Sequence, residues 1–85
     1  MTSDGIRARI RTFFSEAFPG RSLTDDDNIF SLGFGNSLLA MQLVEFIESE
    51  FAIPVDNEDL DIDNFRTITA IGMLVERKTA AVTAA

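Results

Sequence analysis

The residue best placed to carry chemistry is Ser37, which follows a bend-forming segment and opens an apolar stretch. Gly33 and Gly35 bracket Phe34, so we expect the backbone to turn tightly just before the serine. Asn36 is a strong N-cap residue, and a helix that begins at Ser37 leaves unpaired backbone N–H groups at its start. A phosphate on the serine hydroxyl would meet those groups and the positive end of the helix dipole. The position suits a phosphodiester, and it suits equally well a serine that only starts a helix.

Several residue types that enzymes commonly use are absent from the sequence. The chain has no His and no Cys, and its one lysine, Lys78, lies far from Ser37 along the chain. The commonest general base, the commonest zinc ligand and any thiolate are therefore missing. The run Gly-Asn-Ser-Leu also differs from the Gly-x-Ser-x-Gly elbow of hydrolases. We predict that Ser37 is not the nucleophile of a hydrolase.

One acidic stretch is spaced like the start of a calcium loop. Asp59, Asp61 and Asp63 alternate as the first ligands of an EF-hand do. The position that requires glycine is Asn64, and the twelfth position is Ala70 where the loop requires Glu. We therefore predict no specific metal site.

The charge is distributed unevenly along the chain. The 85 residues carry a net charge of −7, and every charged side chain between Ser22 and Phe65 is acidic. Such a field repels nucleic acid and anionic membranes and favours basic protein surfaces, although acidity also simply keeps small domains soluble. The sequence has no apolar stretch long enough to span a membrane and no signal peptide, so we expect a cytoplasmic protein.

Helical patterns predict the elements that position Ser37. A first helix should begin near Ser3 or Asp4, both good N-caps, and end at Pro19-Gly20. Residues 19–36 then form a long connection, and loops of this length are usually functional. The apolar residues expected to face the core from these segments are Ile6, Ile10, Phe13, Phe14, Ala17, Leu23, Ile29, Phe30, Leu32 and Phe34.

The second half of the chain predicts three further helices. The second helix runs from Ser37 to Phe51, a short third covers residues 57–63, and the last opens at Thr67. Arg77 and Lys78 are expected at its C-terminal end, where the helix dipole favours cations. The inner faces should be formed by Leu43, Phe46 and Ile47, and by Ile68, Ile71, Leu74 and Val75.

Together these patterns predict an all-α domain over residues 1–78. We expect a four-helix bundle with three main helices, a short third helix and a long first loop. Residues 79–85 should form a flexible C-terminal tail.

The order of the short motifs resembles the acyl carrier protein family. The family has a hydrophobic loop element, a Gly-x-Asp-Ser-Leu segment that opens the second helix, Glu-x-x-Phe followed by Ile-Pro, and a last helix that opens with Thr. The matching segments, in the same order, are Asn28-Ile29-Phe30-Ser31-Leu32-Gly33, Gly35-Asn36-Ser37-Leu38, Ser49-Glu50-Phe51-Ala52-Ile53-Pro54 and Phe65-Arg66-Thr67-Ile68. The resemblance extends over about residues 4–78 and implies an acyl-carrier-like bundle.

The resemblance implies a covalent cofactor and no catalysis. Ser37, flanked by Asn36 and Leu38, would receive 4′-phosphopantetheine from coenzyme A through a separate phosphopantetheinyl transferase. The terminal thiol of that arm would hold an acyl group as a thioester, and the protein itself would not be an enzyme. The resemblance also implies docking on basic partner surfaces, and we expect a monomer. The expected docking residues are Leu38, Met41, Gln42, Glu45, Glu48, Asp56, Glu58, Asp59 and Asp61.

One departure from the family pattern suggests a subgroup. The usual Asp before the serine is Asn36 here, which keeps the capping oxygen but lacks the charge. Residues 33–44 and 61–68 look like those of freestanding polyketide-pathway carriers of glycerate-derived three-carbon units, namely glyceryl, hydroxymalonyl or methoxymalonyl groups. Partners would then be a loading enzyme such as a glyceryl transferase/phosphatase, a dehydrogenase, and synthase modules. The alternatives are a peptidyl or aminoacyl carrier and an acidic helical interaction module without a prosthetic group.

Overall fold

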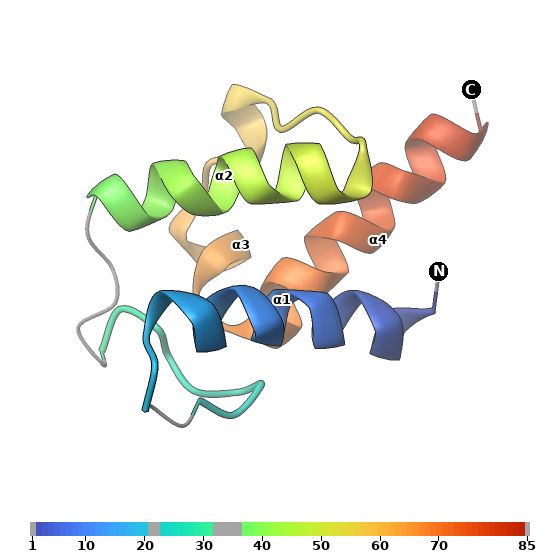
Figure 1. The fold of residues 1–85 in the computed structure, drawn as a ribbon. Coiled ribbons are helices and arrows are strands. Elements are labelled where there is room, and N and C mark those ends of the chain that lie inside the picture. The colour runs from blue at the N-terminus through green and yellow to red at the C-terminus, as the bar shows by residue number, and fades with distance from the viewer. Residues whose placement is uncertain (1, 21–22, 32–36, 85) are drawn as a thin grey trace.

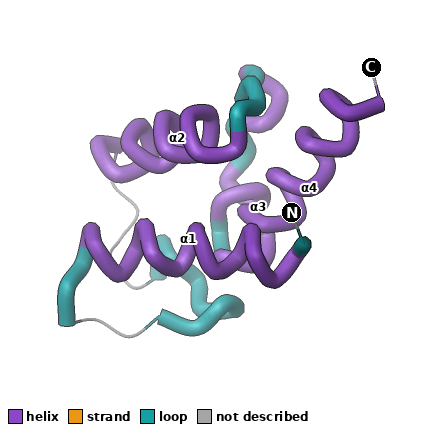
Figure 2. Tube along the Cα trace, turned by 45° about the vertical axis from the view of Figure 1, so that its right-hand side comes forward, coloured by secondary structure: helices purple, strands orange, loops and turns teal. Residues whose placement is uncertain are grey.

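The chain folds into helices joined by loops, as a computed structural model shows (Figure 1). The structure describes the backbone of residues 2–20, 23–31 and 37–84, and the side chains of the same ranges except residues 37 and 82–84. Its elements are α1 (Ser3–Ala17), α2 (Ser37–Phe51), a 3₁₀ turn η1 (Asn57–Asp59), α3 (Ile62–Phe65) and α4 (Ile68–Ala84). The described residues contain helix and loop but no strand (Figure 2), so the all-α prediction is confirmed.

Helix α1 begins at Ser3, as predicted, but a different residue caps it. The N-cap is Thr2, whose hydroxyl accepts a hydrogen bond from Gly5 N at 3.0 Å. The prediction of Ser3 or Asp4 as cap was wrong because the backbone of Thr2 is still extended, which places its hydroxyl over the first turn. The helix ends at Ala17, and Gly20 beyond it adopts a φ of +84°, which favours glycine.

The core lies between the three long helices. α1 and α2 run in opposite directions, and α4 crosses them and packs against α1, α2 and α3 (Figure 1). The predicted inner faces are largely confirmed, with Phe13 and Phe46 only partly buried at their edge. Ala17 is exposed, which corrects its assignment, because it ends α1 and lies beyond the packed turns. The buried side chains are Ile6, Ile10, Phe14, Ile29, Leu39, Leu43, Ile47, Ile53, Ile68, Ile71, Leu74 and Val75.

The predicted short third helix is present, but its bounds differ from those expected. Residues 57–63 hold the 3₁₀ turn η1 and only the start of α3, and Leu60 and Asp61 separate the two elements. Asp59 accepts a hydrogen bond from Asp56 N at 2.9 Å, and Asp61 accepts one from Asp63 N at 2.9 Å. Each acidic side chain therefore closes its own turn, and neither turn propagates into the other.

Helix α4 starts as predicted and extends further. The Thr67 hydroxyl accepts from Ala70 N at 2.9 Å, as expected of an N-cap. The backbone stays helical to Ala84, so it crosses the expected boundary at residue 78; the flexible tail over residues 79–85 stays a prediction. Lys78 consequently lies inside the helix, and its expected role at the C-terminal end was wrong.

The backbone of the long connection before α2 is hydrogen-bonded to the end of α3 and to the start of α4. Ile29 is buried, and its N–H donates to the carbonyl of Arg66 at 2.8 Å. Thr69 N donates to the carbonyl of Asp25 at 3.0 Å. The expected anchoring by Leu23, Ile29 and Phe30 is confirmed, since all are partly or fully buried. Gly33, Gly35, Leu32 and Phe34 lie outside the described residues.

No described helix is both long enough and apolar enough to cross a bilayer.

Candidate functional site

Ser37 is the first residue of α2, as the sequence predicted. A first-turn residue lies beside backbone N–H groups that have no partner within the helix. Asn36, the expected cap, lies outside the described residues. The start of α2 is thus the point where a phosphodiester on the serine would be favoured by the helix dipole.

The side chains that follow Ser37 divide α2 into two faces. Leu39 and Leu43 are buried against the core, whereas Leu38 and Met41 are 67% and 64% exposed. Two large apolar side chains exposed within one turn leave an apolar surface beside the start of the helix. Gln42 continues this face as an exposed polar residue.

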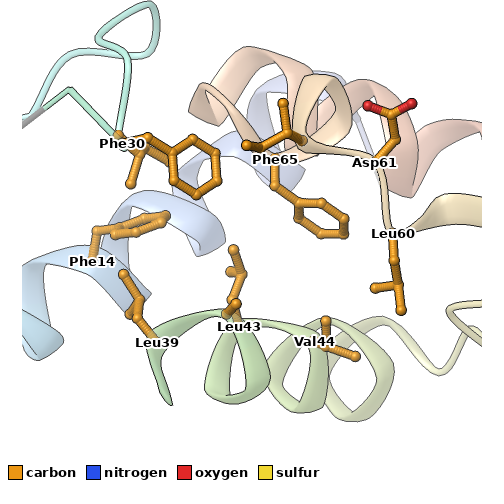
Figure 3. A pocket seen from close by; sticks show the side chains of 11 residues that line it. Phe14, Phe30, Leu39, Leu43, Val44, Leu60, Asp61 and Phe65 are labelled. Carbon is orange, nitrogen blue, oxygen red and sulfur yellow. The ribbon is translucent and has the colours of Figure 1, made fainter. Parts of the chain in front are cut away.

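An apolar cavity of about 230 Å³ lies behind the first turns of α2 (Figure 3). Side chains from α1, the long loop, α2 and the segment around α3 line it. Asp61 is the one charged residue among the described lining residues, and its carboxylate points away from the apolar side chains (Figure 3). The lining residues are Phe14, Ile29, Phe30, Leu39, Ala40, Leu43, Val44, Leu60, Asp61, Ile62 and Phe65.

This cavity could not be predicted from the sequence. Its walls come from four separate segments, so the spacing of apolar residues within any one segment does not predict it. The available signal was the pair Leu60 and Ile62, two apolar residues in an otherwise acidic stretch.

Some of the acidic residues expected to dock partners already form ion pairs or hydrogen bonds within the fold. Asp56 and Asp59 both pair with Lys78 Nζ, at 2.8 and 2.7 Å. The hydrogen bond from Lys78 lowers the pKa of the Asp59 carboxyl, and a second one from Asp56 N adds to that effect. Glu48 accepts a hydrogen bond from Val55 N at 3.0 Å.

Other predicted docking residues present their charge to solvent. Glu45 and Glu58 are exposed, and within the described part of the chain neither has a hydrogen-bond or ion-pair partner. The docking role of Leu38, Met41, Gln42, Glu45, Glu48, Asp56, Glu58, Asp59 and Asp61 stays a prediction.

The alternating aspartates do not converge. Among the described residues, no three acidic side chains gather in a way that could hold a metal ion. Asp59 is paired with Lys78, Asp61 accepts from Asp63 N, and Asp63 pairs with Arg66. Each carboxylate is directed to a different partner, which explains why the EF-hand spacing produces no common centre.

The family comparison now bears on this site. The family model for the phosphopantetheine attachment site matches residues 5–73, most of the chain, including the start of α2. This chain belongs to that family of carrier domains. A search of curated proteins finds no significant match.

As a member of this family, the carrier bears covalent 4′-phosphopantetheine and is not itself a catalyst. When bound, the arm supplies a thiol that holds an acyl group as a thioester. The carrier has no cysteine of its own, so this thiol is the one available to it. Its partners are a phosphopantetheinyl transferase and the enzymes that load the arm and use its cargo.

The described residues fit such an arm. The helix start offers N–H groups to a phosphodiester, and Leu38 and Met41 form an exposed apolar surface next to it.

Proposed function

We propose that the carrier holds its arm at Ser37 and that its cargo is a three-carbon unit derived from glycerate. Glyceryl, hydroxymalonyl or methoxymalonyl groups would pass to a polyketide or related secondary-metabolite pathway, including pathways to antibiotics. The observation that supports Ser37 as the attachment residue is its position. It is the first residue of α2 and lies within residues 5–73, which the family model matches.

The cargo proposal rests on the resemblance of residues 33–44 and 61–68 to freestanding polyketide-pathway carriers. Asn36 in place of the usual acidic residue supports a specialised carrier. The partners would be a glyceryl transferase/phosphatase or similar loading enzyme, a dehydrogenase, and synthase modules. We propose a cytoplasmic monomer.

The cavity favours a second class of cargo, an acyl group with an alkyl chain. Its lining is almost wholly apolar, so it would accept an alkyl chain better than a hydroxylated three-carbon group. A peptidyl or aminoacyl carrier is the remaining alternative. Glyceryl, alkyl-acyl and aminoacyl groups differ in mass, so the mass of the loaded carrier distinguishes them.

The attachment point is tested by intact mass after incubation with coenzyme A and a broad-specificity transferase. The wild type should gain one phosphopantetheine, and Ser37→Ala should gain none. Ser49→Ala, a matched change on the exposed face of the same helix, should be modified like the wild type. Modification of Ser37→Ala would place the arm elsewhere.

The cargo is tested on carrier isolated from its native cells. A mass increase equal to a glyceryl, hydroxymalonyl or methoxymalonyl group supports the three-carbon proposal. A longer acyl or an aminoacyl mass overturns it and leaves the attachment result unaffected.

A further inference from the structure

The segment that joins α2 to α3 forms one wall of the apolar cavity. We call residues Asp56–Ile62 the strap. Leu60, Asp61 and Ile62 of the strap line the cavity together with Val44 of α2. Figure 3 labels Leu60, Asp61 and Val44.

The strap has little apolar burial to hold it in place. Neither η1 nor α3 contains a buried residue, and Leu60 and Ile62 remain 54% and 59% exposed. Because hydrophobic stabilisation scales with the apolar area removed from water, these side chains contribute much less than the core residues of α2 and α4.

Polar contacts to α4 take the place of that burial. The ammonium of Lys78 contacts Asp56 Oδ2 and Asp59 Oδ2 at 2.8 and 2.7 Å. The side chains of Lys78 and Asp59 are only 17% and 18% exposed, so this contact is more shielded from water than ordinary surface ion pairs. Asn64 Nδ2 donates to the carbonyl of Asp59 at 3.0 Å and fixes the same point from α3.

Loss of the ammonium would do more than remove an attraction. Two carboxylates lie within 3 Å of the same nitrogen, and without it they would repel each other. The Asp59 carboxylate also closes η1 through Asp56 N, so a displaced Asp59 releases that turn as well.

We propose that Lys78 is a positioning residue that holds the strap against the cavity. Removal of its charge frees the strap and opens the cavity on the side away from α1. The inference concerns the polypeptide alone and holds whatever cargo the arm carries.

Hydrogen exchange on the unmodified protein tests the proposal. The reporting amides are those of Asp59 and Leu60, which donate to the carbonyls of Asp56 and Asn57. In Lys78→Gln they should exchange about tenfold faster or more, while the amides of α1 and α4 keep their rates. Lys78→Arg keeps the charge and should restore most of the protection.

Arg66→Gln is the matched control. It also removes one cation near α3, but its partner is Asp63, outside the strap. Strap exchange in this variant should match the wild type. An equal acceleration in Arg66→Gln would show that loss of positive charge in general is responsible, and it would overturn the proposal.

A neutral apolar fluorophore, N-phenyl-1-naphthylamine, reports on the cavity. Its binding should tighten severalfold in Lys78→Gln and stay unchanged in Arg66→Gln. Strap exchange in Lys78→Gln within about twofold of wild type overturns the proposal.

If Lys78→Gln loosens the whole domain, Asp56→Asn decides, because the Lys78–Asp59 pair then remains in place. Faster hydrogen exchange confined to the strap amides supports the proposal. Strap exchange at the wild-type rate in this variant overturns it.

Discussion

Asp25 connects three parts of the fold. Its carboxylate accepts hydrogen bonds from Arg11 Nε and Nη2 at 2.6 and 2.7 Å, and Arg7 Nε lies 3.4 Å away. Its backbone carbonyl accepts from Thr69 N at the start of α4. The hydrogen bond from Arg11 lowers the pKa of the Asp25 carboxyl below its ordinary value of 3.8. One residue of the long loop is thus held by both α1 and α4.

This lowered pKa predicts how stability depends on pH. A carboxyl with a depressed folded-state pKa stabilises the fold above its unfolded pKa, and that contribution is lost as pH falls through the folded pKa. Asp25→Asn should therefore unfold at a lower urea concentration than wild type at pH 7, with the gap shrinking as pH falls below 3.8. Urea titrations of both proteins from pH 7 to pH 2 measure this gap.

Asp4→Asn is the control, because Asp4 pairs with the same Arg7 from an almost fully exposed position. Its unfolding midpoint should stay close to wild type at neutral pH. If the difference in urea midpoint between wild type and Asp25→Asn did not change with pH, the stabilisation could not be assigned to the ionised Asp25 carboxylate.

At the scale of elements, the long helices and the short turns differ in what determines them. The inner faces of α1, α2 and α4 follow from apolar spacing, because burying one face of a long helix outweighs local choices. The turns η1 and α3 depend on whether Asp59 and Asp61 accept from Asp56 N and Asp63 N, which spacing does not encode. For the same reason, the cap of α1 was misplaced by one residue.

The two faces of α2 give a prediction about stability. Ile47 is fully buried and Met41 is 64% exposed on the same helix. Ile47→Val should lower the free energy of unfolding by about 0.5–1.5 kcal/mol, because it removes one buried methylene. Met41→Ala, the control on the outer face, should change it by no more than about 0.5 kcal/mol. Chemical denaturation monitored by circular dichroism compares them, and equal losses would contradict the assigned faces.

At the scale of the whole molecule, most of the described positively charged side chains form ion pairs within the fold. Acidic partners hold most of the described cations: Arg7 and Arg11 pair with Asp25, Arg9 with Glu50, Arg66 with Asp63, and Lys78 with Asp56 and Asp59. Which carboxylates remain free follows from these pairs, most of which join residues far apart in the sequence. The sequence predicted that Ser37 begins α2, which the structure confirms, but it could not separate Glu45 and Glu58, which are unpaired within the described residues, from the paired aspartates.

The free carboxylates predict a charge-dependent encounter with basic partners. Glu45→Gln should raise the KM of a phosphopantetheinyl transferase for the unmodified carrier by about two- to fivefold at low salt, since exposed charges at an interface rim act mainly on association. The effect should diminish at high salt.

Glu76→Gln on α4 removes the same charge from another helix and serves as the control. Its KM should stay at the wild-type value, and an equal rise would assign the effect to net charge instead of to the outer face of α2. The measurement is initial modification rate against carrier concentration at two ionic strengths.

The fastening of the long loop also sets an order of events during synthesis. Ile29 and Asp25 bond to Arg66 and Thr69, which follow them by about forty residues along the chain. A ribosome must therefore release the beginning of α4 before the segment leading to Ser37 can take its final path. A nascent chain stopped after α2 would carry the serine beside an unfastened loop, and the loop would take its folded path only after the beginning of α4 has left the ribosome.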